Sequence, residues 1–223
     1  MSKFHSANAC IVVALMITAL AEAQEHVSFP TQDGGIVYAD VYGRGDRAVV
    51  LAHGARFDKG SWEKQGRELA QAGFRAVALD FRGYGKSRGG RISQSPHDEL
   101  YLDVLAAVQY LHGTGAKTVS VVGASMGGGA AGRAAVQADP GQIDGLVLLA
   151  AMPIDKPERM TCRKLFITSQ GDPIADKVRD QYRRSPEPKE LLILDGSAHA
   201  QNIFATDQGE RLMEAIERFL SSP

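Results

Sequence analysis

The chain has 223 residues and a formal net charge of −1, from 25 lysines and arginines against 26 aspartates and glutamates. This balance argues against a nucleic-acid partner, because proteins that bind nucleic acids usually carry a basic excess or a basic stripe. Hydrophobic residues make up 44% of the chain, which is too many for a disordered protein. Two cysteines exclude both a disulfide framework and a cysteine-rich zinc site. The length predicts one domain with a sizeable core.

Residues 1–23 have the pattern of a secretory signal peptide. A weakly basic start is followed by the apolar residues 9–20 and then by Ala21-Glu22-Ala23, which places small residues where signal peptidase reads the chain. The apolar stretch is shorter than the roughly 20 residues that span a bilayer. We therefore expect cleavage after Ala23 and an exported protein, periplasmic or secreted, with no stable membrane insertion. An uncleaved anchor or a hydrophobic core helix is the alternative interpretation.

Strand patterns dominate the first part of the remaining chain. Residues 27–29 and 35–42 alternate between apolar and polar side chains and are bounded by glycine-rich turns, which predicts an antiparallel pair. Short and nearly continuous apolar runs follow, and these are typical of parallel strands that are buried on both faces. The runs cover residues 48–52, 76–79, 119–122, 146–150, 165–168 and 191–194.

Segments with a helical period separate most of these runs. One apolar face recurs from Leu100 to Leu111 behind a capping sequence at residues 95–98, small residues fill 128–138, and the last helical pattern covers 212–220. Strands that alternate with helices indicate an α/β fold with a mostly parallel sheet and helices on both faces. We expect a single domain over residues 24–223.

The pentapeptide Gly123-Ala124-Ser125-Met126-Gly127 directly follows a predicted strand and opens the small-residue helix. A serine nucleophile suits this position, because a tight strand-to-helix turn lifts its hydroxyl above the edge of the sheet. The N-terminus of the helix also favours negative charge nearby. Ser125 is therefore the candidate nucleophile, and an ordinary strand-to-helix turn is the alternative.

Two other glycine motifs are weaker signals. Residues 85–89 repeat the G-x-S-x-G spacing inside a polar loop, residues 82–91, that no predicted strand enters, so Ser87 is predicted to be a loop residue. A Walker phosphate loop is excluded there, because Asp80 stands where its first glycine is required. Residues 127–132 satisfy G-x-G-x-x-G but begin inside the predicted helix, where small side chains let helix and sheet approach, so a dinucleotide site is disfavoured.

A serine nucleophile needs a base to take its proton, and the base must itself be oriented. His199 lies in a small-residue loop after the last predicted strand, and Asp172 lies just after the strand before it. Catalytic groups in open α/β sheets gather beyond the carboxyl ends of the strands. Ser125, Asp172 and His199 are therefore the predicted catalytic residues. A solvated loop histidine is the alternative for His199, and Asp176 is a nearby competitor for Asp172.

A glycine also follows the predicted strand at residues 48–52, in the sequence His53-Gly54-Ala55. A tetrahedral intermediate needs backbone N–H donors aimed at its developing charge, and a glycine permits the close approach. We expect the amides of Ala55 and Met126 to form this oxyanion hole. His53 is expected to shape the loop rather than to act as a base.

Taken in order, these motifs resemble the α/β-hydrolase superfamily over nearly all of residues 24–223. The resemblance implies a twisted sheet of about eight strands and a catalytic triad of Ser125, Asp172 and His199. Ala200 stands where many relatives carry glycine. The resemblance rests on His53-Gly54, residues 80–87 (DFRGYGKS), residues 123–128, Gly171-Asp172-Pro173 and Gly196-Ser197-Ala198-His199.

Such a triad implies a serine hydrolase that cleaves a small carboxylic ester or thioester through an acyl-enzyme, with no cofactor and no metal ion. Many relatives insert a lid where this chain has only residues 151–164, so we expect no lid domain, as in small dienelactone-hydrolase-like and carboxylesterase-like enzymes. A peptidase, a cofactor-free haloperoxidase and a non-catalytic binding module on the same fold are the alternatives. Candidate side chains lining the site are Phe57, Trp62, Tyr84, Met152, Ile174 and Phe204.

Overall fold

The computed structural model describes residues 24–90 and 98–222, which build one nine-stranded sheet with helices on both faces. The predicted signal peptide and most of the predicted cap at residues 95–98 lie outside the described residues. The sheet opens with β1 (Glu25–Pro30) and β2 (Gly35–Tyr42). These two strands pair antiparallel, as their alternation predicts.

Six parallel strands continue the sheet and match the six predicted apolar runs, except that β7 ends at Leu149 and leaves Ala150 of the predicted run 146–150 outside the strand. The strand order is β1-β2-β4-β3-β6-β7-β8-β9, with β2 and β4 antiparallel to one another. The register pairs Ala52 with Gly123, so the carboxyl ends of neighbouring strands meet at one edge. The parallel strands are β3 (Arg47–Ala52), β4 (Arg75–Leu79), β6 (Thr118–Ala124), β7 (Gly145–Leu149), β8 (Arg163–Ser169) and β9 (Lys189–Leu194).

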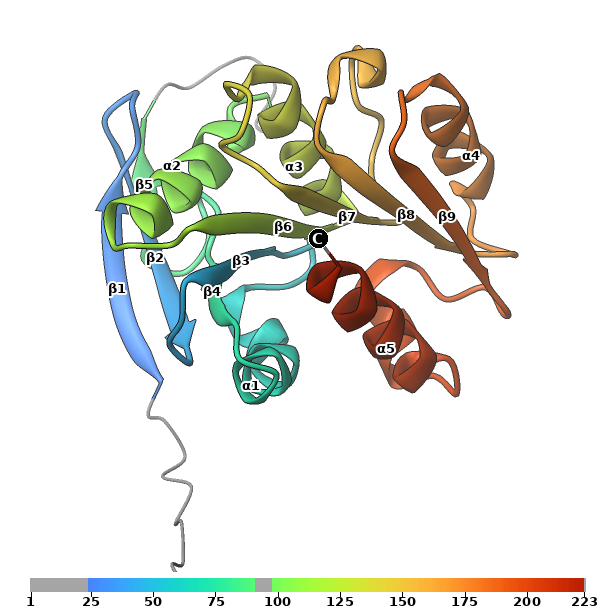
Figure 1. The fold of residues 1–223 in the computed structure, drawn as a ribbon, viewed down its shortest axis with the longest axis horizontal. Helices are drawn as coiled ribbons and strands as arrows, with labels where there is room; N and C mark the ends of the chain where they lie inside the picture. The colour runs from blue at the N-terminus through green and yellow to red at the C-terminus, as the bar shows by residue number, and fades with distance from the viewer. Residues whose placement is uncertain (1–23, 91–97, 223) are drawn as a thin grey trace, which may run out of the picture.

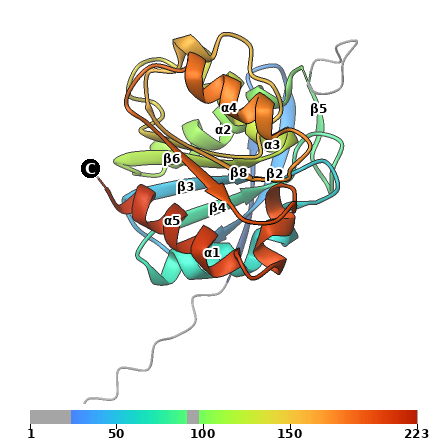
Figure 2. The same cartoon turned by 90° about the vertical axis from the view of Figure 1, so that its right-hand side faces the viewer.

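Two helical layers enclose the sheet, as Figures 1 and 2 show. Along β6, Val121 packs into the core on the side of α2, α3 and α4, whereas Val122 packs into the core on the side of α1 and α5. This alternation explains why the central strands are apolar on both faces. The first layer contains α2 (Leu100–Gly113), α3 (Met126–Gln137) and α4 (Ala175–Arg184), and the second contains α1 (Glu63–Gln71) and α5 (Gly209–Ser221).

The connection between β7 and β8 is short, as the sequence predicts. It holds only the 3-10 turn η2 (Pro157–Arg159) and leaves no room for a lid domain. Two further 3-10 turns, η1 (Lys59–Trp62) and η3 (Ala200–Ala205), lie before α1 and before α5. Within the ranges that the structure describes, no helix combines the length and the hydrophobicity that a membrane span needs.

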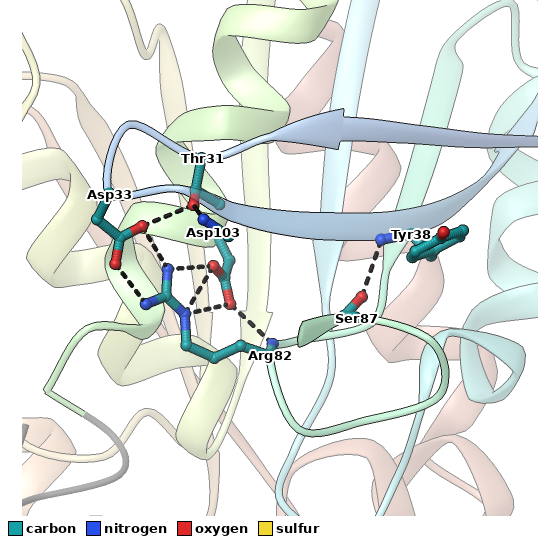
Figure 3. A network of polar contacts seen from close by, with 7 residues as sticks. Thr31, Asp33, Tyr38, Arg82, Ser87 and Asp103 are labelled. Carbon is teal, nitrogen blue, oxygen red and sulfur yellow. Dashed lines mark hydrogen bonds and ion pairs between the residues drawn. The ribbon is translucent and has the colours of Figure 1, made fainter. Parts of the chain in front are cut away.

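The polar loop after β4 differs from its prediction, because it contains a two-residue strand. This strand, β5 (Arg88–Gly89), pairs antiparallel with the start of β2. Ser87 precedes it and is buried, with its hydroxyl accepting a hydrogen bond from the Tyr38 amide at 2.8 Å (Figure 3). A strand of two residues is too short to show an alternating hydrophobic pattern, so the sequence alone does not predict β5.

A buried charge network fastens the same loop to α2 and to the β1–β2 turn (Figure 3). The Arg82 guanidinium donates to Asp103 at 2.6 Å and to Asp33 at 2.7 Å. Thr31 donates to Asp33 at 2.6 Å, and the side chain of Asp103 is fully buried. Removing one member of such a network leaves a buried charge uncompensated, which is strongly destabilising. The network therefore fixes the path of the chain beyond β4.

Lys164 in β8 is a second buried cation, and it is held by backbone oxygens. Its Nζ donates to the carbonyls of Cys162 at 2.6 Å and Met160 at 3.2 Å, and the residue is fully buried. Burial lowers the pKa of Lys164 below its ordinary value of 10.5. The folded protein therefore binds this proton less tightly than the unfolded chain does.

We expect Lys164→Met to flatten the alkaline pH dependence of stability. Between the lowered pKa of Lys164 in the folded protein and its ordinary value of about 10.5, the unfolded state binds this proton more tightly than the folded state does. The free energy of unfolding of the wild-type protein therefore increases as the pH rises through that window. Urea unfolding at about pH 8 and about pH 10 measures the slope. Lys177→Met, at an exposed position of α4, is the control. Equal slopes for Lys164→Met and the wild type would contradict the account.

Candidate active site

Ser125 stands at the sharp turn between β6 and α3. Its backbone has φ 51° and ψ −112°, which is outside both the helical and the strand regions. Such a conformation costs about 1–3 kcal/mol for a residue with a side chain. Neighbouring elements hold it in place: the Ser125 amide donates to Leu149 at 2.9 Å, and its carbonyl accepts from Met152 at 2.9 Å and from Gly129 at 3.0 Å.

Glycines on either side of Ser125 allow this turn. A Cβ atom on Gly127 would lie against the carbonyl oxygens of Ala52 and His53 at the end of β3. A Cβ atom on Gly123 would collide with Gly127 and with the side chain of Ala131. Only glycine lets the first turn of α3 approach the sheet this closely, so the G-x-S-x-G spacing has a direct steric cause.

His199 joins Ser125 to Asp172 by hydrogen bonds. Its Nε2 lies 2.8 Å from Ser125 Oγ, and its Nδ1 lies 2.8 Å from Asp172 Oδ2. The Asp172 side chain is fully buried, and its Oδ1 accepts from the Ile174 amide at 2.9 Å. In a neutral imidazole, Nδ1–H donates to the carboxylate and leaves Nε2 to accept the serine proton. The loops after β6, β8 and β9 thus bring the three predicted residues together.

The competing residues lie elsewhere. The side chain of Asp176 is fully exposed in the first turn of α4 and pairs with Arg179 at 3.1 Å. Ser87 is bound to the backbone of β2, as described above. Neither residue is hydrogen-bonded to His199 in the part of the chain that the structure describes.

The two residues predicted for the oxyanion hole flank Ser125. Ala55, Ser125 and Met126 border the same cavity, whose volume is ≈ 270 Å³. Met126 is the first residue of α3, so the helix itself does not use its N–H group. The Ala55 N–H donates to no acceptor among the residues that the structure describes. Both amides are therefore free to receive a ligand oxygen in this cavity.

His53 ties the loop that carries Ala55 to the loop that follows β4. It is fully buried; its Nδ1 donates to the Gly54 carbonyl at 2.9 Å, and its Nε2 accepts from the Phe81 amide at 3.3 Å. Burial lowers the pKa of His53, which favours the neutral ring that both bonds require. Tyr84 packs edge-on against the His53 ring and donates its hydroxyl to the Ala55 carbonyl at 2.8 Å. This arrangement supports a loop-shaping role for His53.

Gln201 makes a further connection that the sequence does not reveal. It is buried; its Oε1 accepts from the Gly54 amide at 2.7 Å, and its Nε2 donates to Ser61 at 2.8 Å. The one feature of the sequence that points to a role for Gln201 at the site is its position two residues after His199. Ala200, between them, has a φ of 51°, so this alanine adopts the left-handed conformation that glycine would adopt without strain.

Most of the residues expected to line the site do not border the cavity. Met152 does, but Trp62 is 1% exposed and packs edge-on against Phe204 in the core beside α1 and α5. The prediction for Trp62 is wrong, because Trp62 ends η1 with its side chain packed between the sheet and the layer of α1 and α5. Phe57, Tyr84, Ile174 and Phe204 are not among the residues that border the cavity either. Its other boundaries are Asp98, Gly129, Ala130, Arg133 and Pro153.

No group of three or more His, Cys, Asp or Glu side chains within residues 24–90 and 98–222 is arranged to hold a metal ion.

Solved structures with the same fold are numerous, and they share little sequence with this chain. The esterase Pf2001 of Pyrococcus furiosus superposes with a TM-score of 0.73 at 20% identity, covering 89% of this chain and 94% of that chain. The dienelactone hydrolase of Anabaena variabilis superposes with a TM-score of 0.71 at 18% identity, covering 88% of this chain and 96% of that chain. At these identities the similarity shows the fold alone.

Sequence comparisons identify the family. The chain is 30% identical over 160 residues to the putative protein-lysine deacylase ABHD14B of Rattus norvegicus, covering 68% of this chain and 74% of that protein. It is 32% identical over 125 residues to a non-heme haloperoxidase of Rhodococcus erythropolis but spans only 42% of that relative's length. A family model described as "serine aminopeptidase, S33" matches residues 43–168, more than half of the chain. The chain therefore belongs to this family of α/β hydrolases.

Proposed function

We propose that the protein is a serine hydrolase that cleaves small carboxylic esters or thioesters through an acyl-enzyme. The hydrogen-bonded chain from Asp172 through His199 to Ser125, with both distances at 2.8 Å, carries the proposal. A base that takes the serine proton and a carboxylate that orients this base are the two requirements of such catalysis. Membership of the α/β-hydrolase family supports the same conclusion.

Each residue has one role in the proposed reaction. Ser125 Oγ attacks the carbonyl carbon while His199 Nε2 takes its proton, and Asp172 stabilises the resulting imidazolium. The amides of Ala55 and Met126 donate to the oxyanion, and each such donor contributes about 3 kcal/mol to the transition state. The alcohol or thiol leaves with the proton from His199. Water then attacks the acyl-enzyme by the same route and releases the acid.

Removal of an acyl group from a lysine amine is a second candidate function. The name of the relative that matches 68% of this chain, a putative protein-lysine deacylase, favours it. The same residues would act, with His199 protonating an amine instead of an alcohol. Parallel assays with p-nitrophenyl acetate and with an acetyl-lysine peptide separate the two functions, because an esterase turns over the first far faster.

We expect a fluorophosphonate probe to label the wild-type protein and to leave Ser125→Ala unlabelled. The probe requires an activated serine, and hydrolysis of p-nitrophenyl esters should fall at least about 1,000-fold in this variant. Ser87→Ala is the control because Ser87 has the other G-x-S-x-G motif, and it should still be labelled when circular dichroism shows a native fold. Labelling of Ser125→Ala at the wild-type rate would refute the proposal.

We expect Gln201→Leu to lower kcat roughly tenfold with a smaller effect on KM, since the loop that carries Gly54 and Ala55 loses its hydrogen bond to the Gln201 side chain. The Asp172–His199–Ser125 chain is untouched, so the pH profile of kcat should not shift. Gln201→Glu keeps an acceptor for the Gly54 amide and should restore most of the activity.

Gln71→Leu, at an exposed position at the end of α1, serves as the control for this substitution. An unchanged kcat in a folded Gln201→Leu protein would show that Gln201 does not position the oxyanion hole.

A further inference from the structure

A groove leads away from Ser125 along one face of α3. Gly129 and Ala130 border the ≈ 270 Å³ cavity beside Ser125, and so does Arg133, one turn further along α3. Arg133 also borders a second cavity of ≈ 450 Å³ further along the helix. Residues three and four apart share a helix face, so these side chains form one continuous floor.

The described boundary of the cavity beside Ser125 is mostly apolar and carries one ion pair, between Arg133 and Asp98. Gly129, Ala130, Met152 and Pro153 supply small or apolar surface. Among the residues that the structure describes, Arg133 is the basic residue on the boundary, and Asp98, whose carboxylate pairs with it, is the acidic one. A ligand extending from Ser125 along this floor would therefore meet apolar walls first and a guanidinium at the end.

Part of the Arg133 guanidinium is available to hydrogen-bond a ligand. Its Nη1 donates to the Asp98 carbonyl at 2.8 Å and to Asp98 Oδ1 at 3.3 Å, while its Nη2 lies 3.7 Å from Asp155 Oδ2. Nε and Nη2 donate no hydrogen bond to the residues that the structure describes. The two carboxylates are 49% and 87% exposed, and such exposed pairs contribute little. A ligand carboxylate could replace Asp155 with a planar, bidentate contact.

The proposed mechanism decides which half of the substrate occupies this groove. The leaving group must lie near His199 Nε2 to receive its proton. His199 does not border the cavity, whereas both proposed oxyanion donors, Ala55 and Met126, do. The acyl half of the substrate therefore extends along α3.

We infer that this acyl half ends in a carboxylate that Arg133 binds, so that the substrates are monoesters or monothioesters of dicarboxylic acids. The inference rests on the proposed serine-hydrolase function. Eight residues of helix separate the backbones of Ser125 and Arg133 by about 12 Å. A helical side chain leans toward the N-terminus, which brings the guanidinium closer to Ser125. An acyl chain of about six to eight carbons, as in adipate or suberate, fits this span.

Mono-p-nitrophenyl adipate and p-nitrophenyl hexanoate, which share a chain of six carbons, test the inference. We expect the wild-type kcat/KM to favour the adipate roughly tenfold, mainly through KM, because one charge-assisted bidentate contact is gained. Arg133→Gln should bring this ratio close to one, and Arg133→Lys should retain part of it. Asp155→Asn should raise the ratio, because it removes a competing carboxylate.

Arg179→Gln is the matched control. Arg179 is 29% exposed and pairs with a fully exposed aspartate, whereas Arg133 is 30% exposed and pairs with an aspartate that is 87% exposed. The control should leave the ratio of the two substrates unchanged. A wild-type protein that hydrolyses hexanoate without preferring adipate, or an Arg133→Gln protein with the wild-type ratio, would overturn the inference and leave the serine-hydrolase proposal standing.

Hydrolysis of neither ester would instead count against the proposed ester substrates, and binding then decides the role of Arg133. Calorimetry with monomethyl adipate and Ser125→Ala should show affinity roughly tenfold higher than that of Ser125→Ala/Arg133→Gln. Equal affinities of the two proteins would overturn the inference without any measurement of turnover.

Discussion

The close contact between the first turn of α3 and the end of β3 is the constraint on which the site depends. Gly127 meets the carbonyls of Ala52 and His53 with no room for a side chain, and β7 holds the strained backbone of Ser125 from the other side. This contact places the serine hydroxyl and the Met126 amide at the edge where the parallel strands end. The loops after β8 and β9 then bring Asp172 and His199 into a hydrogen-bonded chain that ends at this hydroxyl.

The loops around Ser125 are held by polar contacts, the two at Gly54 buried and one at Ala55 exposed, that take no direct part in the proposed reaction. The neighbouring His53 ring donates to the Gly54 carbonyl, the distant Gln201 side chain accepts from the Gly54 amide, and Tyr84 donates to the Ala55 carbonyl. Breaking either buried contact at Gly54 would leave a buried donor or acceptor without a partner, which costs about 1–3 kcal/mol. These contacts therefore fix the position of the Ala55 amide more tightly than the loop could by itself, as preorganised stabilisation of an oxyanion requires.

The proposed substrate preference follows from the same architecture. Because the connection between β7 and β8 is short, Met152 and Pro153 lie directly over the start of α3, and the floor of the groove is the helix itself. Small residues at 129 and 130 keep that floor open, and Arg133 ends it one turn later. Specificity would then reside on a rigid helix, where the distance between the backbones of Ser125 and Arg133 is fixed by helical geometry.

The sequence by itself determined the α/β class, the parallel strands, the connection without a lid, and the identity of Ser125, Asp172 and His199 as candidates. These features follow from local signals: apolar runs, tight turns and polar residues placed just after strands. The short strand β5, the buried position of Trp62, and the roles of Gln201 and Arg133 were decided only by the tertiary structure. Each depends on which side chains from distant segments face one another, and no local pattern in a single chain encodes that.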